Sequence, residues 1–485
     1  MSSADPRSLL ERLQDHHDQG YLSLHMPGHK ENSDLAPYLR RLGADLDITE
    51  LPEFDDLHDP EGILAQSMDR AAALWGSRRS YLQVNGSTGG LLAAIRAATR
   101  RGDQILVARN CHKAIYHAIE LCGLDPVFLL PPTEETFGLS GSISPEMVAR
   151  ALEEHPNIKL VVYPSPTYDG VISDTAGICA AAHARGVPVL VDEAHGAHLG
   201  LSPVFPPCAM GQGADLAVSS LHKMLPSLTQ TAVLHASGQR VPLPEVARQT
   251  GIFQSSSPSY LLMASMDGCL RLLEQDREAL CAAWMGRLKT FDQKVQGLRH
   301  LRLPGHGAEA GAEYPNIFAL DPAKIVISTR NSALTGVELK ERLRADYKIE
   351  LEMALDHYAV AMTGLGTGDD MPGRLAQALL ELDEKYGPAQ EPAPAIQPVP
   401  ELPPRKCSIE QAAMAPGGID FLYDSMGKVC GEYIWAYPPG IPLITPGEVI
   451  TTPLVESIET LYRAGVKLIG TRGKPPFTTV ALRET

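Results

Sequence analysis

The pattern that most constrains the fold of this chain is a series of short apolar segments separated by helix-like sequence and turns. Segments such as IKLVVY at 158–163 and VPVLVD at 187–192 have the length and composition of buried strands. Short strands that alternate with helices predict an α/β domain with a mainly parallel sheet. Ligands of such sheets bind beyond the carboxyl ends of the strands. The other predicted strands lie at 81–84, 104–108, 215–219 and 230–235, and helices are predicted at 91–100, 111–123 and 175–186, the last ending at a glycine C-cap.

The chain has 485 residues, which is too long for one ordinary core. Residues 387–404 are rich in proline and have no apolar period, which predicts a linker. Residues 1–60 are rich in turn formers and are expected to form an arm over the main domain. We therefore predict an N-terminal arm (1–60), a major domain (61–300), a small α/β domain (301–386), the linker (387–404) and a C-terminal domain (405–485).

Composition excludes some classes of protein. The formal charge is −16, which disfavours a nucleic-acid partner because phosphate neutralisation needs a basic surface. The acidity either attracts a small cation or only keeps the protein in solution. No apolar run is long enough to predict a membrane span, and no signal sequence is evident. Eight scattered cysteines without a C-x-x-C pair indicate reduced thiols, so we expect a cytoplasmic protein.

The segment VNGSTGG at 84–90 joins a predicted strand to a predicted helix. The free N–H groups and the dipole of a helix N-terminus attract a phosphate, and the hydroxyls of Ser87 and Thr88 add donors. Gly86 lies in the turn itself. The alternative is a glycine-rich turn in which a hydroxyl only caps the helix.

The segment VLVDEAHGAH at 189–198 delivers Asp192 at the end of a buried strand, followed by His195 and His198. A carboxylate there can keep a ring nitrogen protonated. A metal site made of these three residues is a weaker alternative, because it lacks the spacing of known zinc motifs. A third possibility is that Asp192 caps a helix and both histidines lie on the surface.

The segment DLAVSSLHKML at 215–225 carries Lys223 to the end of another apolar strand. A desolvated lysine amine is nucleophilic and can form a Schiff base with a carbonyl cofactor. Ser220 and His222 would then lie near a phosphate. The alternative is a lysine whose stem is buried while its ammonium reaches water. In combination, the phosphate site, the aspartate and the lysine describe a pyridoxal phosphate site, and no metal is expected.

Nine motifs run in order along the chain: HMPGHK (25–30), DITE (47–50), VNGSTGG (84–90), RNCHKA (109–114), PTYDG (166–170), DEAHGAHL (192–199), SSLHKMLPSLTQ (219–230), SSSPSYLLMASMD (255–267) and YPPGIPLITPGE (437–448). They resemble the bacterial ornithine/lysine/arginine decarboxylases, in a short form without a receiver-like domain before HMPGHK. The resemblance implies the fold-type-I architecture of pyridoxal phosphate enzymes, with a three-layer αβα major domain and a smaller α+β C-terminal part.

The resemblance also implies roles for individual residues. Gly86, Ser87, Thr88, Ser220 and His222 match the phosphate site, and His112 matches a histidine that stacks on the pyridine ring. Asp192 matches the partner of the ring nitrogen, His195 a histidine near the cofactor and substrate, and Lys223 the lysine that binds the cofactor. Such sites lie at a dimer interface, so Ser257 is expected to reach the phosphate of the neighbouring subunit. The chain departs from the family pattern at Lys428, where arginine is common, and in SSSPSY, where threonine is common.

The expected reaction is decarboxylation of a basic L-amino acid, with arginine favoured over lysine or ornithine. Acidic residues in the segments 350–358 and 367–371 are candidates for reading the distal cationic group, although most of them are expected to be solvated. The motif YPPGIPLITPGE is expected to form a rigid loop. Alternatives that keep the same cofactor are an aminotransferase or an amino-acid oxidase. A metal-dependent hydrolase and a non-catalytic relative are the others.

Overall fold

The computed structural model describes residues 6–32, 34–305, 313–392, 399, 401–437 and 440–483. The chain divides into two compact units, each built from two stretches. Unit 1 contains Met1–Ala97 and Glu193–Cys281, and unit 2 contains Ala98–Asp192 and Ala282–Thr485. In the described part of the chain, no helix is long and apolar enough to cross a membrane. Parts of the predicted linker, residues 393–398 and 400, lie outside the described residues.

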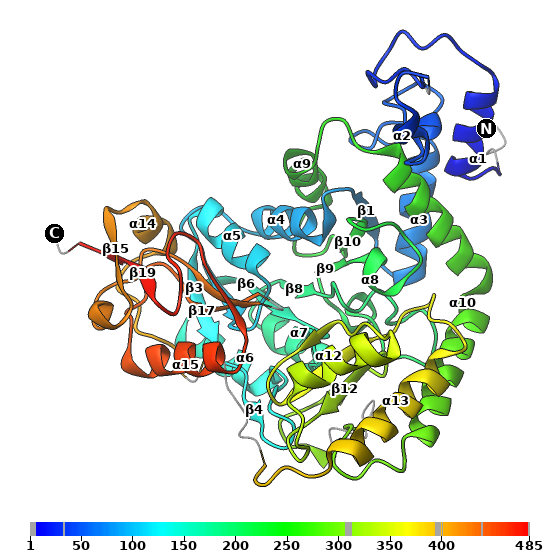
Figure 1. Cartoon of the computed structure of the whole chain (residues 1–485). Coiled ribbons are helices and arrows are strands. Elements are labelled where there is room, and N and C mark those ends of the chain that lie inside the picture. The colour runs from blue at the N-terminus through cyan, green and yellow to red at the C-terminus, as the bar shows by residue number, and fades with distance from the viewer. Residues whose placement is uncertain are drawn as a thin grey trace. The chain divides into compact units, whose positions relative to one another are not determined.

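Unit 1 is held together around a three-stranded antiparallel sheet. Strand β10 (Ala232–Ala236) pairs with β1 (Arg79–Gln83) on one side and with β9 (Leu216–Ser219) on the other. Every residue of β10 is buried, which fits its apolar sequence. The helices of this unit are α1 (Leu9–Asp18), α2 (Pro37–Arg40), η1 (Ala44–Leu46), α3 (Ile63–Trp75), α4 (Gly86–Ala98), η2 (Met210–Gln212), α8 (Leu221–Met224) and α9 (Leu243–Phe253), with α10 (Tyr260–Lys294) continuing into unit 2 (Figure 1).

The first helix of unit 1 is anchored to α10 by a buried carboxylate. Asp267 of α10 is fully buried and accepts a hydrogen bond from the backbone N–H of Leu9 at 2.9 Å. It also accepts from the hydroxyl of Ser67 on α3 at 2.5 Å and from Arg271 at 2.9 Å. Three helices far apart in the sequence are therefore joined at one side chain.

Unit 2 contains the parallel part of the fold. Strands β2 (Gln104–Ala108), β3 (Asp125–Leu129), β6 (Ile158–Pro164) and β8 (Val189–Asp192) form a parallel ladder in the order β3-β2-β6-β8. Helices α5 (Lys113–Cys122), α6 (Pro145–Glu154) and α7 (Thr175–His183) connect them, as parallel strands require. The register pairs Pro164 with Asp192, so the carboxyl ends of β6 and β8 are neighbours. Short antiparallel pairs join β4 (Thr133–Glu134) to β5 (Leu139–Ser140) and β7 (Val171–Ile172) to β11 (Ala319–Leu320).

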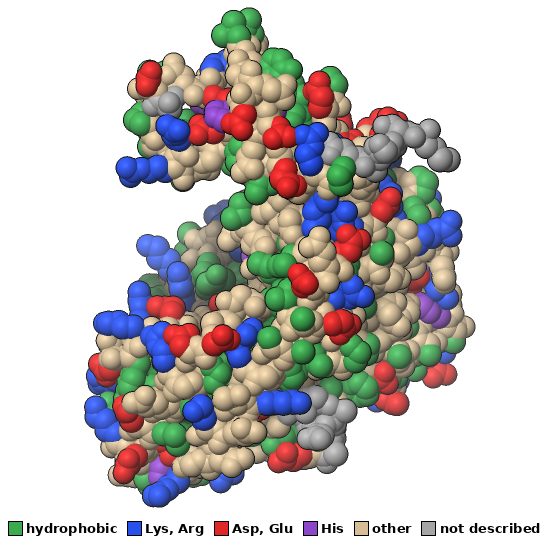
Figure 2. Space-filling model, turned by 90° about the vertical axis from the view of Figure 1, so that its right-hand side faces the viewer, with side chains coloured by type: hydrophobic (Ala, Val, Ile, Leu, Met, Phe, Trp, Pro, Cys, Tyr) green, Lys and Arg blue, Asp and Glu red, His purple; other side chains and the backbone are tan. Residues whose placement is uncertain are grey.

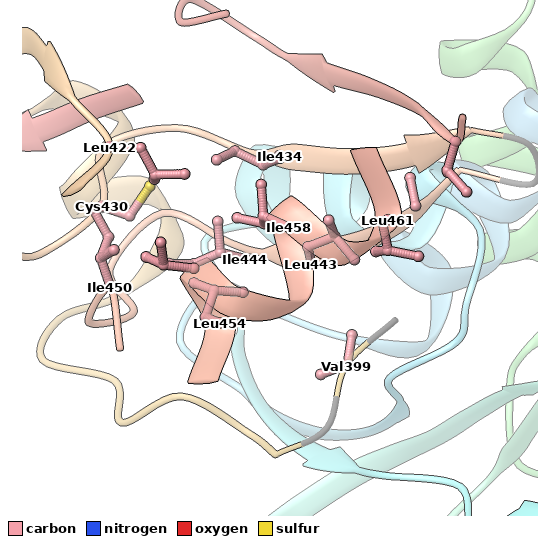
Figure 3. Packing of buried hydrophobic residues seen from close by; sticks show 13 residues of the cluster. Val399, Leu422, Cys430, Ile434, Leu443, Ile444, Ile450, Leu454, Ile458 and Leu461 are labelled. Carbon is pink, nitrogen blue, oxygen red and sulfur yellow. The ribbon is translucent and has the colours of Figure 1, made fainter. Parts of the chain in front are cut away.

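The rest of unit 2 forms two smaller antiparallel layers. In the first, β14 (Tyr358–Met362) pairs with β12 (Lys324–Ser328) and β13 (Met353–Ala354), accompanied by α12 (Gly336–Tyr347) and α13 (Met371–Tyr386). In the second, β16 (Ile434–Tyr437) pairs with β17 (Ile441–Ile444) and β18 (Lys467–Gly470). Helix α15 (Thr452–Arg463) turns Leu454, Ile458 and Leu461 toward Leu443 and Ile444, and together they form a buried apolar cluster (Figure 3). The remaining elements are α14 (Ile409–Met414), η3 (Tyr423–Ser425), β15 (Gly417–Phe421) and β19 (Thr478–Leu482), and β15 pairs with β19.

The predicted α/β class with a mainly parallel sheet is confirmed, with three local differences. Strand β10 runs antiparallel to its neighbours, because the connection from β9 holds only the single helical turn of α8 and cannot cross the sheet. Helix α7 has its C-cap at Ala184, and Gly186 takes a left-handed conformation two residues later. The motif YPPGIPLITPGE is not simply a loop, since it supplies strand β17, while residues 438–439 lie outside the described residues.

Candidate active site

The turn between β1 and α4 in unit 1 is fixed by two glutamine side chains. The backbone N–H of Val84 donates to Oε1 of Gln254 at 2.7 Å, and the carbonyl of Val84 accepts from Nε2 of Gln230 at 2.6 Å. Gly86 has a φ of +68°, a left-handed conformation that a side chain would strain. The chain thus turns sharply and begins α4 with its first N–H groups directed out of the helix.

Two hydroxyls meet at this helix N-terminus. Oγ of Ser87 lies 2.6 Å from Oγ of Ser220, which is the residue immediately before α8. Ser220 is buried, Ser87 is half-buried and Thr88 is exposed. Hydroxyls together with the N–H groups of a helix N-terminus provide several donors for one anion.

The lysine that the sequence singled out lies against a histidine. Nζ of Lys223 is 2.9 Å from Nε2 of His195, and both side chains are wholly or partly buried. A contact of this length between two nitrogens requires a proton between them, so the pair shares at least one proton. The arrangement can hold an amine and pass a proton at one place.

His222 is oriented by a backbone carbonyl. Its Nδ1 donates to the carbonyl of Thr231 at 2.8 Å, so the proton of the neutral ring is on Nδ1. Burial and then the positive charge of Lys223 lower the pKa of His222. Its Nε2 can donate to an anion only when the ring is protonated, which a nearby phosphate would favour.

The loop that carries His195 is held at three points within unit 1. Glu193 accepts from the backbone N–H of Ala209 at 2.7 Å and from the hydroxyl of Ser219 at 3.3 Å. Its burial raises the pKa of Glu193 to about 8, and the two hydrogen bonds oppose this rise. The indole N–H of Trp75 donates to the carbonyl of Ala197 at 3.2 Å. The loop is therefore a rigid support for His195.

The metal alternative gains no support from this loop. His198 is fully buried and its ring packs edge-on against Phe205, with ring centroids 4.8 Å apart. Across the described ranges, no group of three or more His, Cys, Asp or Glu side chains is arranged to hold a metal ion.

Unit 2 carries the other two residues that the sequence assigned to the cofactor ring. Asp192 is the last residue of β8 and is buried. His112 is the N-cap of α5, and its Nδ1 accepts from the backbone N–H of Ala114 at 3.2 Å. The residue before His112 is Cys111, and the pKa of its thiol is raised by burial and then by the charge of Asp192. The turn that follows β2 and the end of β8 therefore belong to one neighbourhood.

The acidic residues considered for a distal cationic group differ in their surroundings. Asp369 and Asp370 are exposed and pair with arginines of unit 2. Glu352 instead accepts a hydrogen bond from the hydroxyl of Tyr168. Tyr168 belongs to the turn after β6, where the N–H of Ser165 donates to the carbonyl of Asp192 at 3.1 Å. Of these acidic residues, Glu352 is the one tied to the turn beside Asp192.

One predicted site residue, Ser257, forms hydrogen bonds within its own loop, and three residues that shape the site were not predicted. Ser257 lies in an exposed loop, where its N–H donates to the hydroxyl of Ser255 at 3.2 Å. Gln230, Gln254 and Glu193 shape the site but were not identified from the sequence. Glu193 and Gln230 lie within recognised motifs and Gln254 directly precedes one, yet an amide or carboxylate that binds backbone groups leaves no distinctive pattern.

The fold and the site define a class: α/β enzymes of fold type I with a lysine near the end of a sheet strand. A family model described as the major domain of Orn/Lys/Arg decarboxylases matches residues 7–304. The arginine decarboxylase of Bacillus anthracis is 31% identical over 470 residues, covering 95% of this chain and 94% of that protein. The arginine decarboxylase of Halalkalibacterium halodurans is 32% identical over 479 residues, covering 97% and 96%.

Solved structures agree on the fold. The lysine decarboxylase of Francisella novicida superposes with a TM-score of 0.82 at 17% identity, covering 98% of this chain and 81% of that one. The constitutive lysine decarboxylase of Escherichia coli gives 0.81 at 18% identity, with 98% and 82% covered. Together with the family model and the close relatives, these findings mean that the chain belongs to the Orn/Lys/Arg decarboxylase family and is an amino-acid decarboxylase.

Proposed function

We propose that this decarboxylase uses pyridoxal 5′-phosphate and acts on arginine in preference to lysine and ornithine. The observation that carries the proposal is the contact of Lys223 with His195, in the same unit as the paired hydroxyls of Ser87 and Ser220. The preference for arginine is supported by relatives named arginine decarboxylase that match nearly the whole chain.

The residues present fit this cofactor. An anion would be held by the hydroxyls of Ser87 and Ser220, the first N–H groups of α4 with Thr88, and a protonated His222. An aldehyde needs a nucleophilic amine, which Lys223 supplies, and a pyridine nitrogen needs a carboxylate, which Asp192 supplies. The imidazole of His112, at the N-terminus of α5, would face the ring.

The chain's own residues then divide the work. When bound, pyridoxal phosphate supplies an aldehyde for the substrate amine and a ring that takes up the electron pair left when CO2 departs. Asp192 would keep the ring nitrogen protonated, because a buried carboxylate stabilises a cationic partner. The Lys223–His195 pair holds a proton at Nζ or Nε2, and this proton replaces the carboxylate on the α-carbon. The net reaction consumes one proton and releases CO2 and an amine.

We propose Glu352 as the acidic partner of the substrate's guanidinium. Its carboxylate is tied through Tyr168 to the turn beside Asp192, and a guanidinium forms paired hydrogen bonds with a carboxylate. The acidic balance of the chain, with 58 acids against 42 bases, is compatible with a cationic substrate.

We also propose a homodimer with Ser257 reaching the phosphate of the partner subunit. The support is the arm of unit 1 around α1 and α2, where hydrophobic side chains are exposed (Figure 2). Leu22 and Leu24 are 84% and 85% exposed, and patches of this kind mark interfaces. The large apolar side chains of this arm that remain exposed are Leu10, Tyr21, Leu22, Leu24, Met26, Leu35, Tyr38 and Leu42.

Light scattering tests the dimer. Wild-type protein should have twice the monomer mass, and Leu22→Glu with Leu24→Glu should shift it toward monomer. Leu121→Glu is the control, since Leu121 is 64% exposed and belongs to unit 2 rather than to the arm. A monomeric wild type with full activity would contradict the proposal. A cytoplasmic location is proposed as well, supported by eight scattered cysteines, none of which forms a C-x-x-C pair.

The function is tested by CO2 release with identification of the amine. Purified protein with pyridoxal phosphate is given arginine, lysine and ornithine in parallel. We expect CO2 and the matching amine, with the highest kcat/KM for arginine. A higher kcat/KM for lysine or ornithine would contradict the proposed substrate. Formation of a keto acid or peroxide without CO2 would contradict the proposed reaction.

A further inference from the structure

We propose that a buried ion pair between Arg109 and Glu448 is a positioning device, through which the C-terminal part of the chain (residues 401–483) fixes the turn that carries His112. This inference rests on the proposed cofactor, because the role of His112 depends on it. It gives a function to Arg109 of the motif RNCHKA and to Glu448 at the end of YPPGIPLITPGE, two residues that the chemistry of the site does not otherwise use.

The ion pair between Arg109 and Glu448 is bidentate and buried. Nη1 and Nη2 of Arg109 donate to the two carboxylate oxygens of Glu448 at 2.9 and 2.8 Å. Both side chains are 1% exposed. Nη2 also lies 3.3 Å from the carbonyl of Leu443, to which it donates. A paired, fully desolvated contact of this kind fixes orientation as well as distance.

The Glu448 end of the pair is rigid. Its carboxylate accepts from the backbone N–H of Thr445 at 2.8 Å, and its carbonyl accepts from Cys430 at 2.8 Å. Leu443, whose carbonyl binds Arg109, is fully buried in the apolar cluster with Ile444 and α15 (Figure 3). The carboxylate therefore presents a fixed target.

The Arg109 end leads directly to His112. The backbone N–H of Arg109 donates to Leu129 at 2.7 Å, its carbonyl accepts from the hydroxyl of Tyr116 at 2.7 Å, and its guanidinium lies over the ring of Phe128. Three residues later His112 caps α5. Both ends of the RNCHKA turn are thus bound, one through Arg109 and the other through the first turn of α5.

The C-terminal part also contacts α5 directly. The hydroxyl of Tyr433 donates to Glu120 at 2.9 Å, and Trp435 of β16 packs edge-on against Tyr116, with ring centroids 5.8 Å apart. Helix α5 and its N-cap are held against the same layer that carries Glu448.

Attachment of the C-terminal part to the rest of unit 2 does not require a buried ion pair at this position. Arg101 with Glu410 and Arg405 with Asp125 join the same two parts of unit 2, and these pairs are partly or largely exposed. They attach the C-terminal part without the cost of desolvating two charges. The buried pair differs from them in its fork geometry and in its place beside His112.

The experiment is a double-mutant cycle on cofactor affinity. The variants are Arg109→Lys, His112→Ala and both together, with Glu410→Gln as the control ion pair. Lysine keeps the charge but loses the fork, so Arg109→Lys is expected to raise the Kd for pyridoxal phosphate about tenfold and to reduce the visible circular dichroism of the bound cofactor. In the His112→Ala background, Arg109→Lys should cause no further loss of affinity. Glu410→Gln should leave both signals unchanged.

Two results would overturn the inference. One is an unchanged Kd and dichroism in folded Arg109→Lys, and the other is full additivity of the two substitutions, as expected of a purely structural role. If Arg109→Lys does not fold, Glu448→Gln takes its place in the same cycle. Wild-type protein that binds no pyridoxal phosphate would instead reject the proposed cofactor, so the two failures are distinguishable.

Discussion

Nζ of Lys223 lies 2.9 Å from Nε2 of His195, and the two residues come from segments 28 positions apart in unit 1. The contact makes their protonation states interdependent, since a single proton satisfies both nitrogens. A lysine held in this way is available as a nucleophile and as a proton carrier.

Removing either member of this pair should therefore have distinct effects. Lys223→Ala is expected to abolish decarboxylation and the visible absorbance of the bound cofactor. His195→Asn should keep the absorbance and lower kcat by about 10²–10⁴-fold, the usual share of a proton-transfer group. Steady-state kinetics and absorbance spectra measure both. Turnover by Lys223→Ala at the wild-type rate would contradict the assignment.

The paired hydroxyls should act on cofactor affinity rather than on chemistry. Ser220→Ala removes the hydroxyl that contacts Ser87 and, in the proposed site, one hydrogen bond to the charged phosphate. Such a bond is worth about 1.5–3 kcal/mol, or roughly a 10–100-fold rise in Kd. Ser237→Ala is the matched control, because the half-buried hydroxyl of Ser237 accepts from the backbone N–H of Gln239 within its own turn. Fluorescence titration with pyridoxal phosphate measures the Kd. Equal affinities of the two variants would rule out a phosphate role for Ser220.

Glu193 should make the protein less stable as pH rises. Its folded pKa of about 8 lies above the usual 4.5, so the unfolded state loses its proton first. Folding stability then falls between about pH 4.5 and 8, by on the order of 4 kcal/mol at the upper end. Glu193→Gln mimics the protonated side chain. Its stability should match wild type near pH 5 and exceed it near pH 8, measured by denaturant unfolding of the cofactor-free protein.

The control for this pH effect is Glu245→Gln. The hydrogen bond from Arg248 is the main reason that the pKa of Glu245 is lowered to about 2. Glu245 is thus ionised throughout the window, and its contribution is lost only as pH falls below about 4.5. The difference between this variant and wild type should stay constant from pH 5 to 8. If the stability difference between Glu193→Gln and wild type were also constant from pH 5 to 8, the raised pKa of the buried Glu193 would be contradicted.

Glu352 should matter to substrate binding. Glu352→Gln removes the charge that we propose binds the guanidinium, so the KM for arginine should rise about 10–100-fold with a smaller change in cofactor affinity. Glu350→Gln is the control, since Glu350 lies in the same segment and pairs with Arg344 in solvent. Equal KM values for the two variants would show that another residue reads the distal group.

Much of the fold could be predicted because its signals are local. The parallel strands of unit 2 were recognisable from apolar runs, and strand β2 lies at the predicted residues 104–108. The antiparallel direction of β10 could not be predicted, because it depends on the length of the connection through α8, which is too short to cross the sheet. The predicted domain boundaries remain a prediction.

The residues of the candidate site also fall into those that local sequence indicates and those that it does not. Lys223, Asp192 and the Ser87 turn could be proposed from the sequence because polar residues at strand ends interrupt an apolar pattern. The bond between Arg109 and Glu448 joins positions 339 residues apart, and no local pattern connects them. Glu193 was passed over because its buried carboxylate follows Asp192 in the same motif and has no sequence signal of its own.

The most direct test of the account is to locate the cofactor on the chain. Holoenzyme is reduced with borohydride, which fixes a lysine-bound pyridoxal phosphate, and the peptides are mapped by mass spectrometry. The account predicts a single modified peptide with the pyridoxyl group on Lys223, absent in Lys223→Ala. Modification at another lysine, or none in protein that releases CO2 from arginine, would contradict it.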